Sequence, residues 1–268
     1  MDPEASRTSS VQLAKSMEGK PSVRFLDPTT AYDLWSEVYD TDNNFLQALD
    51  TIEMRTLLPK MFSQMSFSPP WKIVDLGCGT GRNMISLLDL SDSTVIGLDA
   101  SPKMLDVAKR RINEHAAQIS RASEATQRAQ LELYNLSGSY QIPPCALNAD
   151  ALISTLVLEH VPLSIFFERV SELLKPNGLA LVTNMHSDMG AISQAGFVDP
   201  RNGEKVRTQS FAHHLDDVVV EAQKQGFDIV SEILERAVHE KMSEVLGARA
   251  RKWIGVTVWF GILFRKQA

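Results

Sequence analysis

Short apolar runs alternate with amphipathic segments along most of the chain, and this pattern predicts its secondary structure. An apolar run of roughly four to eight residues between turn-forming residues predicts a buried strand, whereas apolar residues spaced three and four apart predict a helix. The expected strands are 72–76, 94–99, 131–134, 150–156, 179–184, 227–234 and 256–266. Because helical segments separate most of these strands, we expect an α/β fold with a largely parallel sheet covered on both faces.

The part of the chain before the first strand has a different character. Residues 1–24 are polar and predict a disordered tail. Residues 25–66 contain two helical patterns, and Pro59 is expected to kink or end the second helix. We expect these helices to form a lid on a domain at 67–268, in which the aperiodic segment at about 185–214 lines a substrate pocket.

Composition narrows the classes of partner. The formal net charge of −6 disfavours nucleic acid, because proteins that bind it usually carry basic stripes. Cys78 and Cys145 are too few for a disulfide framework, so we expect a reducing, cytoplasmic compartment. The apolar segment 253–264 is shorter than the roughly 20 residues of a membrane-spanning helix and is expected to be a strand. No spacing of Cys, His and Asp predicts a metal site.

The segment 72–81 is the strongest functional signal. It reads as a buried strand followed by glycines at 77, 79 and 81, where the backbone must pass close to a ligand at a helix N-terminus. A phosphate-binding loop or a dinucleotide site would need a different residue at the position of Arg82. The acidic Asp75 suits an ammonium or sulfonium group, and Asp99 ends the second strand where it could bind two ribose hydroxyls. These features favour a cationic nucleoside cofactor.

Four segments carry a family resemblance: 74–81, 97–101, 156–162 and 174–178. In this order they resemble the motifs of class I S-adenosylmethionine-dependent methyltransferases, over nearly the whole chain from Tyr32 onward. The N-terminal helices and the C-terminal segment are similar to those of small-molecule methyltransferases of fungal secondary metabolism. The resemblance implies a Rossmann-like, doubly wound sheet of seven strands, mostly parallel with the last strand antiparallel, and S-adenosyl-L-methionine as the cofactor.

The resemblance also implies roles for individual residues. Asp75, Gly77 and Gly79 would line the methionine half of the cofactor, with Cys78 as a small residue tolerated in the turn. Asp99 would hold the ribose, and Ala100, Ser101 and Met104 would lie next to the nucleoside. The cofactor site is completed by three further residues, which are Tyr39 closing over the cofactor, Asn135 as an amide near the adenine, and Leu156 beneath the sulfonium. For Tyr39, which lies seven residues after Tyr32, core packing is an alternative to a cofactor role.

The implied function is transfer of a methyl group to an O or N atom of a small molecule. His160, His186 and His213 follow strands or the aperiodic segment and are candidates for a base that removes the acceptor's proton. Phe197, Phe211 and Trp253 are expected to contact the acceptor; His115 and His239 are expected at the surface. The alternatives are a protein that binds the cofactor without methyl transfer, such as a cyclisation catalyst or regulatory partner, or a methyltransferase acting on nucleic acid or protein.

Overall fold

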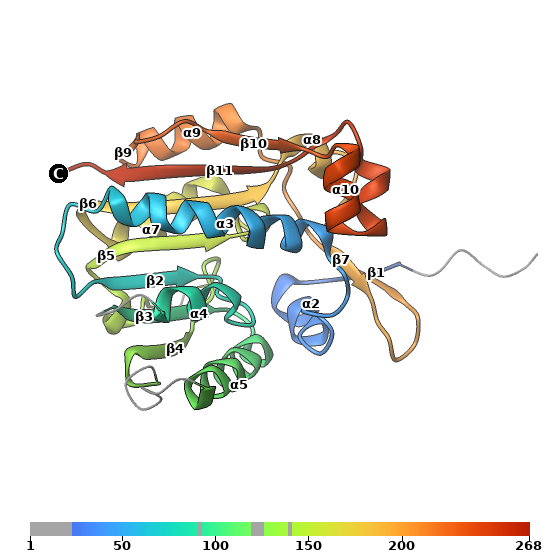
Figure 1. The fold of residues 1–268 in the computed structure, drawn as a ribbon, viewed down its shortest axis with the longest axis horizontal. Coiled ribbons are helices and arrows are strands. Elements are labelled where there is room, and N and C mark those ends of the chain that lie inside the picture. The colour runs from blue at the N-terminus through green and yellow to red at the C-terminus, as the bar shows by residue number, and fades with distance from the viewer. Residues whose placement is uncertain (1–22, 90–92, 119–125, 139–140) are drawn as a thin grey trace, which may run out of the picture.

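The computed structural model describes residues 23–89, 93–118, 126–138 and 141–268. Its main sheet has eight strands, in the order β10-β11-β6-β5-β2-β3-β4, with β9 also paired to β11 (Figure 1). The strands β2 to β6 are parallel to one another, and β11 is antiparallel to β6, as the sequence predicts. Their bounds are Lys72–Leu76 (β2), Thr94–Asp99 (β3), Ala129–Leu133 (β4), Ala149–Thr155 (β5), Leu174–Met185 (β6) and Thr257–Lys266 (β11).

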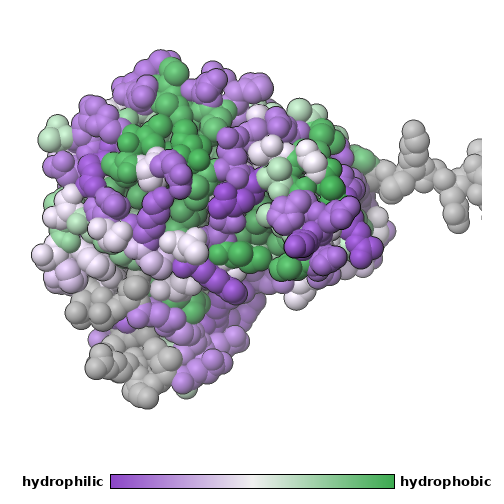
Figure 2. All heavy atoms as spheres, turned by 45° about the horizontal axis from the view of Figure 1, so that its top comes forward, coloured by the Kyte–Doolittle hydropathy of each residue, from purple (hydrophilic) through white to green (hydrophobic). Residues whose placement is uncertain are grey.

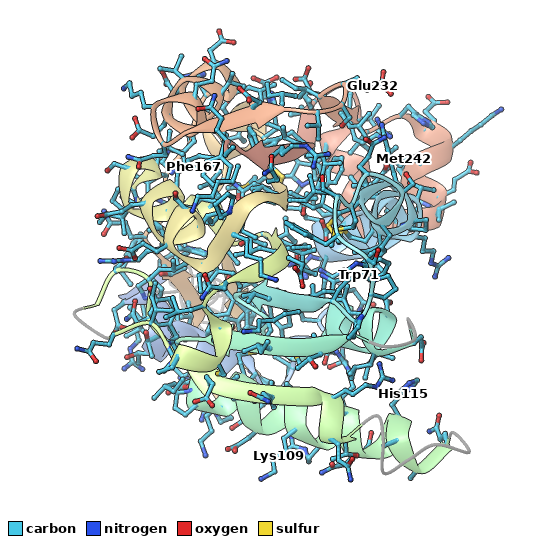
Figure 3. All side chains as sticks on the ribbon, turned by 90° about the vertical axis from the view of Figure 1, so that its left-hand side faces the viewer. Trp71, Lys109, His115, Phe167, Glu232 and Met242 are labelled. Carbon is cyan, nitrogen blue, oxygen red and sulfur yellow. The ribbon has the colours of Figure 1, made fainter. Side chains whose placement is uncertain are left out.

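The strand expected at 227–234 is instead two short strands, β9 (Phe227–Ile229) and β10 (Leu234–Ala237). Ile229 pairs with Phe264 and Leu234 pairs with Gly261, so the segment 230–233 is two residues longer than the part of β11 that it faces. The surplus residues leave the ladder at the outer edge of the sheet, where Glu232 lies (Figure 3). This break explains why the sheet has one strand more than the seven expected.

Helices cover both faces of the sheet, and each face has its own core cluster. On one face lie α3 (Phe45–Ser63), α4 (Arg82–Leu88) and α5 (Pro102–Gln118). On the other lie α7 (Leu163–Leu173) and α9 (Leu215–Lys224). The shorter helices are η1 (Pro144–Ala146), η2 (Leu158–His160), α8 (Ser187–Gly190), α10 (Glu240–Leu246) and η3 (Ala248–Trp253). The doubly wound α/β architecture is therefore confirmed.

The helix α3 differs from its sequence-based expectation in two ways. It continues through Pro59 to Ser63, because its buried Met54, Leu57 and Met61 pack along the core and outweigh the lost backbone hydrogen bond. It also packs against β6 and β11. Of the two N-terminal helices, α3 thus belongs to the layer that covers the sheet, whereas α2 (Pro28–Trp35) lies beyond the strand ends (Figure 1).

A second, three-stranded sheet was not expected from the sequence. It consists of β1 (Val23–Leu26), β8 (Lys205–Thr208) and β7 (Gly196–Val198), with β8 in the middle. Phe197 and Val206 from this sheet form a small core with Trp35 of α2 and Met104 of α5. The sheet therefore holds α2 in place. The tail boundary expected at residue 24 falls inside β1, and residues 1–22 lie outside the described part.

The surface turned toward the viewer in Figure 2 carries separate apolar patches between hydrophilic side chains. The strongly apolar segment 253–264 forms the end of η3 and most of β11, where seven consecutive residues from Val258 are buried. Within the described residues, no helix is both long and apolar enough to cross a membrane.

Candidate active site

The glycine turn adopts a conformation that only glycine tolerates well. Gly77, Gly79 and Gly81 have φ angles of 74°, 53° and 75°. A Cβ at Gly77 would lie 2.2 Å from Cγ2 of Val157, so steric room as well as φ excludes a side chain there. The Gly77 N–H donates to the carbonyl oxygen of Leu98 at 2.7 Å, which fixes the turn against the end of β3.

A cavity of about 400 Å³ opens where this turn meets the carboxyl ends of β3, β4 and β5. It is the edge at which open α/β sheets bind their ligands. Most of the residues expected to bind the cofactor line it, namely Tyr39, Gly77, Gly79, Asp99, Ala100, Ser101, Met104, Asn135 and Leu156. The lining residues that were not predicted come from the start of α2, from 134–137, from 155–162 and from Gln209. Several of these positions fall within predicted elements or motifs, but nothing in the sequence marks their side chains as facing the site.

Asp99 is positioned by the main chain around it. Its Oδ2 accepts a hydrogen bond from the Gly79 N–H and its Oδ1 accepts one from the Ser101 N–H, both at 2.8 Å. Each carboxylate oxygen can accept a further bond from a ligand in the cavity. Burial raises the pKa of Asp99 to about 6, while these N–H donors act in the opposite direction. Asp99 is therefore a fixed acceptor pair that faces the cavity.

Asp75 is the most unusual group near the turn. It is 1% exposed, and neither carboxylate oxygen has a hydrogen-bond partner among the described residues. Burial raises its pKa to about 7, and Arg82 lowers it only in part. Asp75 does not line the 400 Å³ cavity, in contrast to its expected place beside the methionine half of the cofactor. A buried carboxylate without a partner two residues before Gly77 is nevertheless suited to a cationic ligand.

Cys78 also does not line the cavity. Its side chain is 6% exposed and belongs to the core cluster beneath α4, with its Sγ against the site where a Cβ of Gly97 would lie. Burial raises the pKa of this thiol well above its usual value. The residue is therefore a packing residue inside the turn, with no thiolate available for nucleophilic chemistry.

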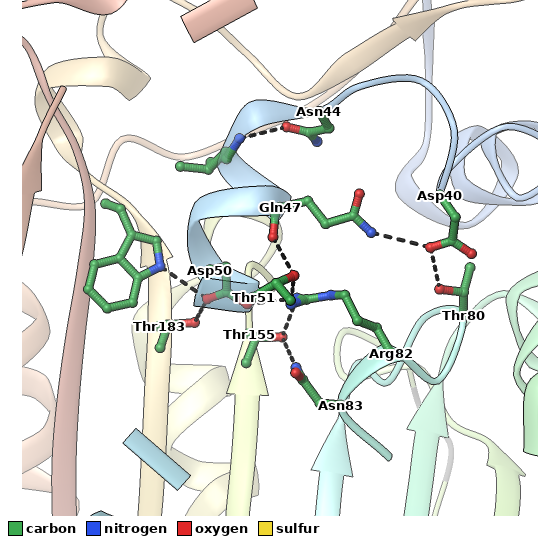
Figure 4. A network of polar contacts seen from close by, with 12 residues as sticks. Asp40, Asn44, Gln47, Asp50, Thr51, Thr80, Arg82, Asn83, Thr155 and Thr183 are labelled. Carbon is green, nitrogen blue, oxygen red and sulfur yellow. Dashed lines mark hydrogen bonds and ion pairs between the residues drawn. The ribbon is translucent and has the colours of Figure 1, made fainter. Parts of the chain in front are cut away.

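A buried polar network anchors the helix that follows the turn (Figure 4). Asp50 on α3 is fully buried and accepts hydrogen bonds from Arg82 Nη2 (2.6 Å), Thr183 Oγ1 (2.5 Å) and Trp259 Nε1 (3.0 Å). Arg82 Nη1 in addition donates to Thr51 Oγ1 at 2.8 Å. One carboxylate thus joins α3, α4, β6 and β11 just beneath the cavity.

The N-terminal segment is joined to the glycine turn and to α5 by further polar contacts. Asp33 on α2 accepts a 2.6 Å hydrogen bond from Ser101 Oγ. Asp40 accepts bonds from Arg111 Nη2 at 2.7 Å and from Thr80 Oγ1 at 3.0 Å. These contacts hold α2 and the residues after it over the cavity.

A second cavity, of about 530 Å³, lies beside the first. Its apolar lining includes Trp35, Phe45, Met185, Met189, Phe197 and Trp253, of which Phe197 and Trp253 were expected to contact an acceptor. Phe211 lines the first cavity instead. Three residues line both cavities: Tyr32, Tyr39 and Leu156. Tyr39 also packs edge-on against Trp35. Its side chain therefore has a packing role and also lines the first cavity.

Leu156 has a backbone conformation that is rare for a leucine. Its φ is 57°, and its N–H donates to the carbonyl oxygen of Thr183 at 2.9 Å. A left-handed conformation at a residue with a Cβ is strained and is found most often at functional sites. Here it places Leu156 at the junction of the two cavities.

Among the candidate bases, only His160 lines either cavity. Its Nε2 lies 2.8 Å from Tyr32 Oη, and its Nδ1 lies 3.2 Å from the carbonyl oxygen of Gln209. Since a carbonyl oxygen only accepts, Nδ1 carries the proton and Nε2 of the neutral ring accepts from Tyr32.

The neighbouring Glu159 was not anticipated from the sequence. It lines the second cavity, is 4% exposed, and its Oε2 has no hydrogen-bond partner among the described residues. Burial raises its pKa above the usual value. Its Oε1 lies 3.9 Å from His160 Nε2, so a carboxylate and an imidazole stand together between the cavities.

The other two histidines line neither cavity. His186 begins α8, where its Nδ1 accepts from the Asp188 N–H at 3.1 Å and its Nε2 lies 3.0 Å from Glu235. His213 Nε2 lies 3.0 Å from the carbonyl oxygen of Val161, and burial lowers its pKa. His186 follows β6 and His213 follows the aperiodic segment, as expected, but their rings make structural contacts. In the described part of the chain, no group of three or more His, Cys, Asp or Glu side chains is arranged to hold a metal ion.

The sheet order, the glycine turn and the cavity beside Asp99 define a class I S-adenosylmethionine-dependent methyltransferase. Residues 74–180 match a family model described as a methyltransferase domain. The chain is 45% identical over 263 residues to an uncharacterized methyltransferase of Emericella nidulans, in a match that covers 90% of this chain and 91% of that relative. The chain belongs to the methyltransferase family.

Solved structures share this fold at low sequence identity. Magnesium protoporphyrin IX methyltransferase from Synechocystis PCC 6803 with bound SAH has a TM-score of 0.58 at 15% identity, covering 89% of this chain and 95% of that chain. The cyclase SpnF has a TM-score of 0.61 at 13% identity, covering 92% and 99%. At these identities the likeness concerns the fold alone.

S-adenosylmethionine is the cofactor of this class, and the residues present fit it. The Asp75 carboxylate, which has no hydrogen-bond partner in the described part of the chain, suits a cationic group. Apart from Gly79 and its two chain neighbours, no atom of the described residues lies within 4 Å of the place where a Cβ of Gly79 would stand, so the backbone there can be approached by a ligand. Asp99 offers two acceptor oxygens at the carboxyl end of β3.

Proposed function

We propose that this enzyme transfers a methyl group from S-adenosylmethionine to an oxygen or nitrogen atom of a small molecule resembling a secondary metabolite. The observation that carries the proposal is the meeting of two cavities at Tyr32, Tyr39 and Leu156. One cavity carries the cofactor motifs, and the lining of the other includes several aromatic side chains. Two adjoining sites are what direct transfer between two bound molecules requires.

In this proposal the first cavity holds the cofactor. Asp99 accepts the ribose hydroxyls, and the Gly77 and Gly79 backbone lies along the methionine half near Asp75. Ser101, Met104 and Asn135 lie around the adenine, and Leu156 and Tyr39 lie at the methyl end. Asp33 on α2 and Asp40 in the residues after it hold this segment over the cavity, where it would exclude water.

The sulfonium of the cofactor would supply an electrophilic methyl carbon, and S-adenosylhomocysteine would be the leaving group when the acceptor's lone pair forms the new bond. The protein positions the acceptor and removes the proton that its O or N atom loses. We propose Glu159 as the group that takes this proton, because its Oε2 has no partner among the described residues and it lines the acceptor cavity. The neutral His160 ring presents its unprotonated Nε2, 3.9 Å from Glu159 Oε1, to the hydroxyl of Tyr32, so in this proposal His160 positions Tyr32 and Glu159 takes the proton.

Two features support a small acceptor over a macromolecule. The second cavity encloses about 530 Å³, a volume typical of small-molecule sites, and the net charge of −6 disfavours nucleic acid. Both cysteines of the chain are free, which agrees with the reducing cytoplasmic location that we propose.

The direct test is incubation with methyl-labelled S-adenosylmethionine and a library of phenols, amides and alicyclic alcohols. Label should appear in a small product, in amounts that depend on Glu159 and Asp99. Label found only in protein or nucleic acid, or tight cofactor binding without any labelled product, would contradict the proposal.

A further inference from the structure

Cationic side chains gather at one side of the second cavity. Lys205 of β8 and Arg249 and Lys252 of η3 all line it, although the two elements are far apart in the sequence. Arg207, two residues along β8 from Lys205, adds a fourth positive charge close by. This concentration of positive charge is unexpected in a chain whose net charge is −6.

We call these four residues, Lys205, Arg207, Arg249 and Lys252, the cationic cluster. Nearby acidic groups balance its positive charge only in part. Arg249 Nη1 donates to the main-chain oxygen of Asp42 at 2.5 Å and lies 3.8 Å from its Oδ2. Lys252 Nζ lies 5.1 Å from the centre of the Trp253 ring. Within the described ranges, neither Lys205 nor Lys252 has an ion pair, and Asp42 and Glu159 are the acidic residues that line the same cavity.

The pKa of Lys205 depends on the cationic side chains around it. Its pKa is lowered from the usual value, first by partial burial and then by the positive charges of Arg207, Lys252 and Arg249. Like charges placed this close destabilise the fold unless something offsets them. A bound anion would offset the repulsion between these positive charges. The ammonium groups of Lys205 and Lys252, which have no ion pair within the described ranges, would donate to it.

Apolar side chains make up much of the remaining lining, beside the polar Asn44, Ser193 and Gln194. Trp35, Phe45, Phe197 and Trp253 provide ring surfaces, and Met185 and Met189 add flexible apolar surface. The cavity therefore combines an apolar wall with a cationic side, and it suits a ligand that has the same two parts.

Building on the proposed function, we infer that the acceptor is an amphiphilic anion. Its apolar body packs among the aromatic side chains, and its anionic oxygen group, a carboxylate or a phosphate, binds Lys205 and Lys252 at the cationic side of the second cavity. Because Glu159 lines the same cavity, the atom that receives the methyl group is on a different part of the acceptor from the anionic group.

The test uses matched aromatic probes rather than the natural acceptor. Binding of 2-naphthoate, 2-naphthamide and 2-naphthyl phosphate is measured by calorimetry on the full chain saturated with S-adenosylhomocysteine. We expect each anion to bind about five- to tenfold more tightly than the amide at low salt, with the gap closing as salt rises. The relative affinity of the carboxylate and the phosphate then distinguishes the two anionic groups.

Substitutions of the two lysines test whether they cause the preference for anions. The double variant Lys205→Met, Lys252→Met keeps the apolar stems and should lose the preference for anions, whereas Lys205→Arg should keep it. The control is Lys241→Met, at an exposed position on α10 that does not line the cavity and should behave as the wild type.

The outcomes separate this inference from the proposed function. If S-adenosylhomocysteine itself does not bind, the proposed function fails. If it binds with an unchanged Kd in every variant, but the anions bind no better than the amide or keep their preference in the double Met variant, the inference is overturned. Smaller probes extend the comparison, because benzoate and cinnamate should also bind more tightly than their amides.

Discussion

Tyr32 and His160 are 128 residues apart in the chain, yet Tyr32 Oη lies 2.8 Å from His160 Nε2. The contact joins α2 to the segment that follows β5, at the place where the two cavities meet. It requires the hydroxyl of Tyr32 to remain protonated, and burial raises the pKa of this hydroxyl well above its usual value. The position of the N-terminal helix and the tautomer of the candidate catalytic imidazole are therefore linked.

Asp99→Ala should weaken binding of S-adenosylhomocysteine by about 1–3 kcal/mol, because two hydrogen bonds from the ribose to a charged acceptor are lost. Isothermal titration calorimetry measures the change. Asp106→Ala, at an exposed position on α5, is the matched control. An unchanged Kd for Asp99→Ala would remove the assigned role.

The cofactor-free protein should lose stability as pH rises from about 4 to 7 through the contribution of Asp75. Its pKa is about 7 in the folded protein against a usual 3.8, so the folded state binds more protons than the unfolded state in this window. Asp75→Asn removes this dependence and should raise the free energy of unfolding at pH 8 by about 2–4 kcal/mol. Urea denaturation at several pH values measures it.

The same Asp75 substitution should have the opposite effect on cofactor affinity. A cationic amino group gains from an ionised Asp75, so affinity of the wild type should rise as pH increases from about 5.5 to 7.5, and this rise should be smaller in Asp75→Asn. If the variant showed both higher stability and undiminished affinity, Asp75 would have no part in binding.

Gly77→Ala should reduce cofactor affinity at least about tenfold and destabilise the fold by roughly 1–3 kcal/mol. The new Cβ would meet Cγ2 of Val157 at 2.2 Å, and φ at this position is 74°. Adding Val157→Ala removes the steric clash but not the backbone strain, so the double variant should recover only part of the loss. Val157→Ala alone is the control, and full recovery in the double variant would show that φ contributes nothing.

Glu159→Gln should lower kcat by about 10²- to 10⁴-fold once an acceptor is known, with little change in the KM for the cofactor. In the wild type, kcat should fall as pH decreases below the raised pKa of Glu159, because the protonated carboxyl cannot take a proton. This limb of the pH profile should disappear in the variant. Glu168→Gln, at an exposed position on α7 that lines neither cavity, is the matched control.

Asp50→Ala should destabilise the protein by about 3–5 kcal/mol, because Arg82 would be left without its buried partner. Thr183 and Trp259 would each lose an acceptor as well. Asp50→Asn keeps an acceptor oxygen and should have an intermediate effect. Thermal unfolding of both variants measures the difference, and a midpoint for Asp50→Asn equal to that of the wild type would show that the charge of Asp50 is unimportant.

The sequence predicted the parts of the fold that depend on local signals. The turn after β2 was identified because alternate glycines and the preceding Asp75 are adjacent in the chain. The place of Asp99 beside this turn was predicted because the carboxyl ends of parallel strands share one edge of the sheet.

Other features depend on contacts between distant segments. The pairing of Val23 with Lys205 has no signature in either short strand, so the second sheet was missed. The break between β9 and β10 follows from their register on β11. Glu159 is a single acidic residue in an apolar run, and only its burial and its place beside the second cavity set it apart.

The meeting of the two cavities at Leu156 has a kinetic consequence. If the second cavity takes the acceptor as proposed, both cavities are available in one conformation, and the cofactor and the acceptor would occupy the enzyme at the same time. We then expect a single displacement in a ternary complex, with inverted configuration of the methyl carbon. Since Cys78 is buried and its pKa is raised, we expect no covalent methyl-enzyme in this turn and initial-rate plots that intersect rather than run parallel.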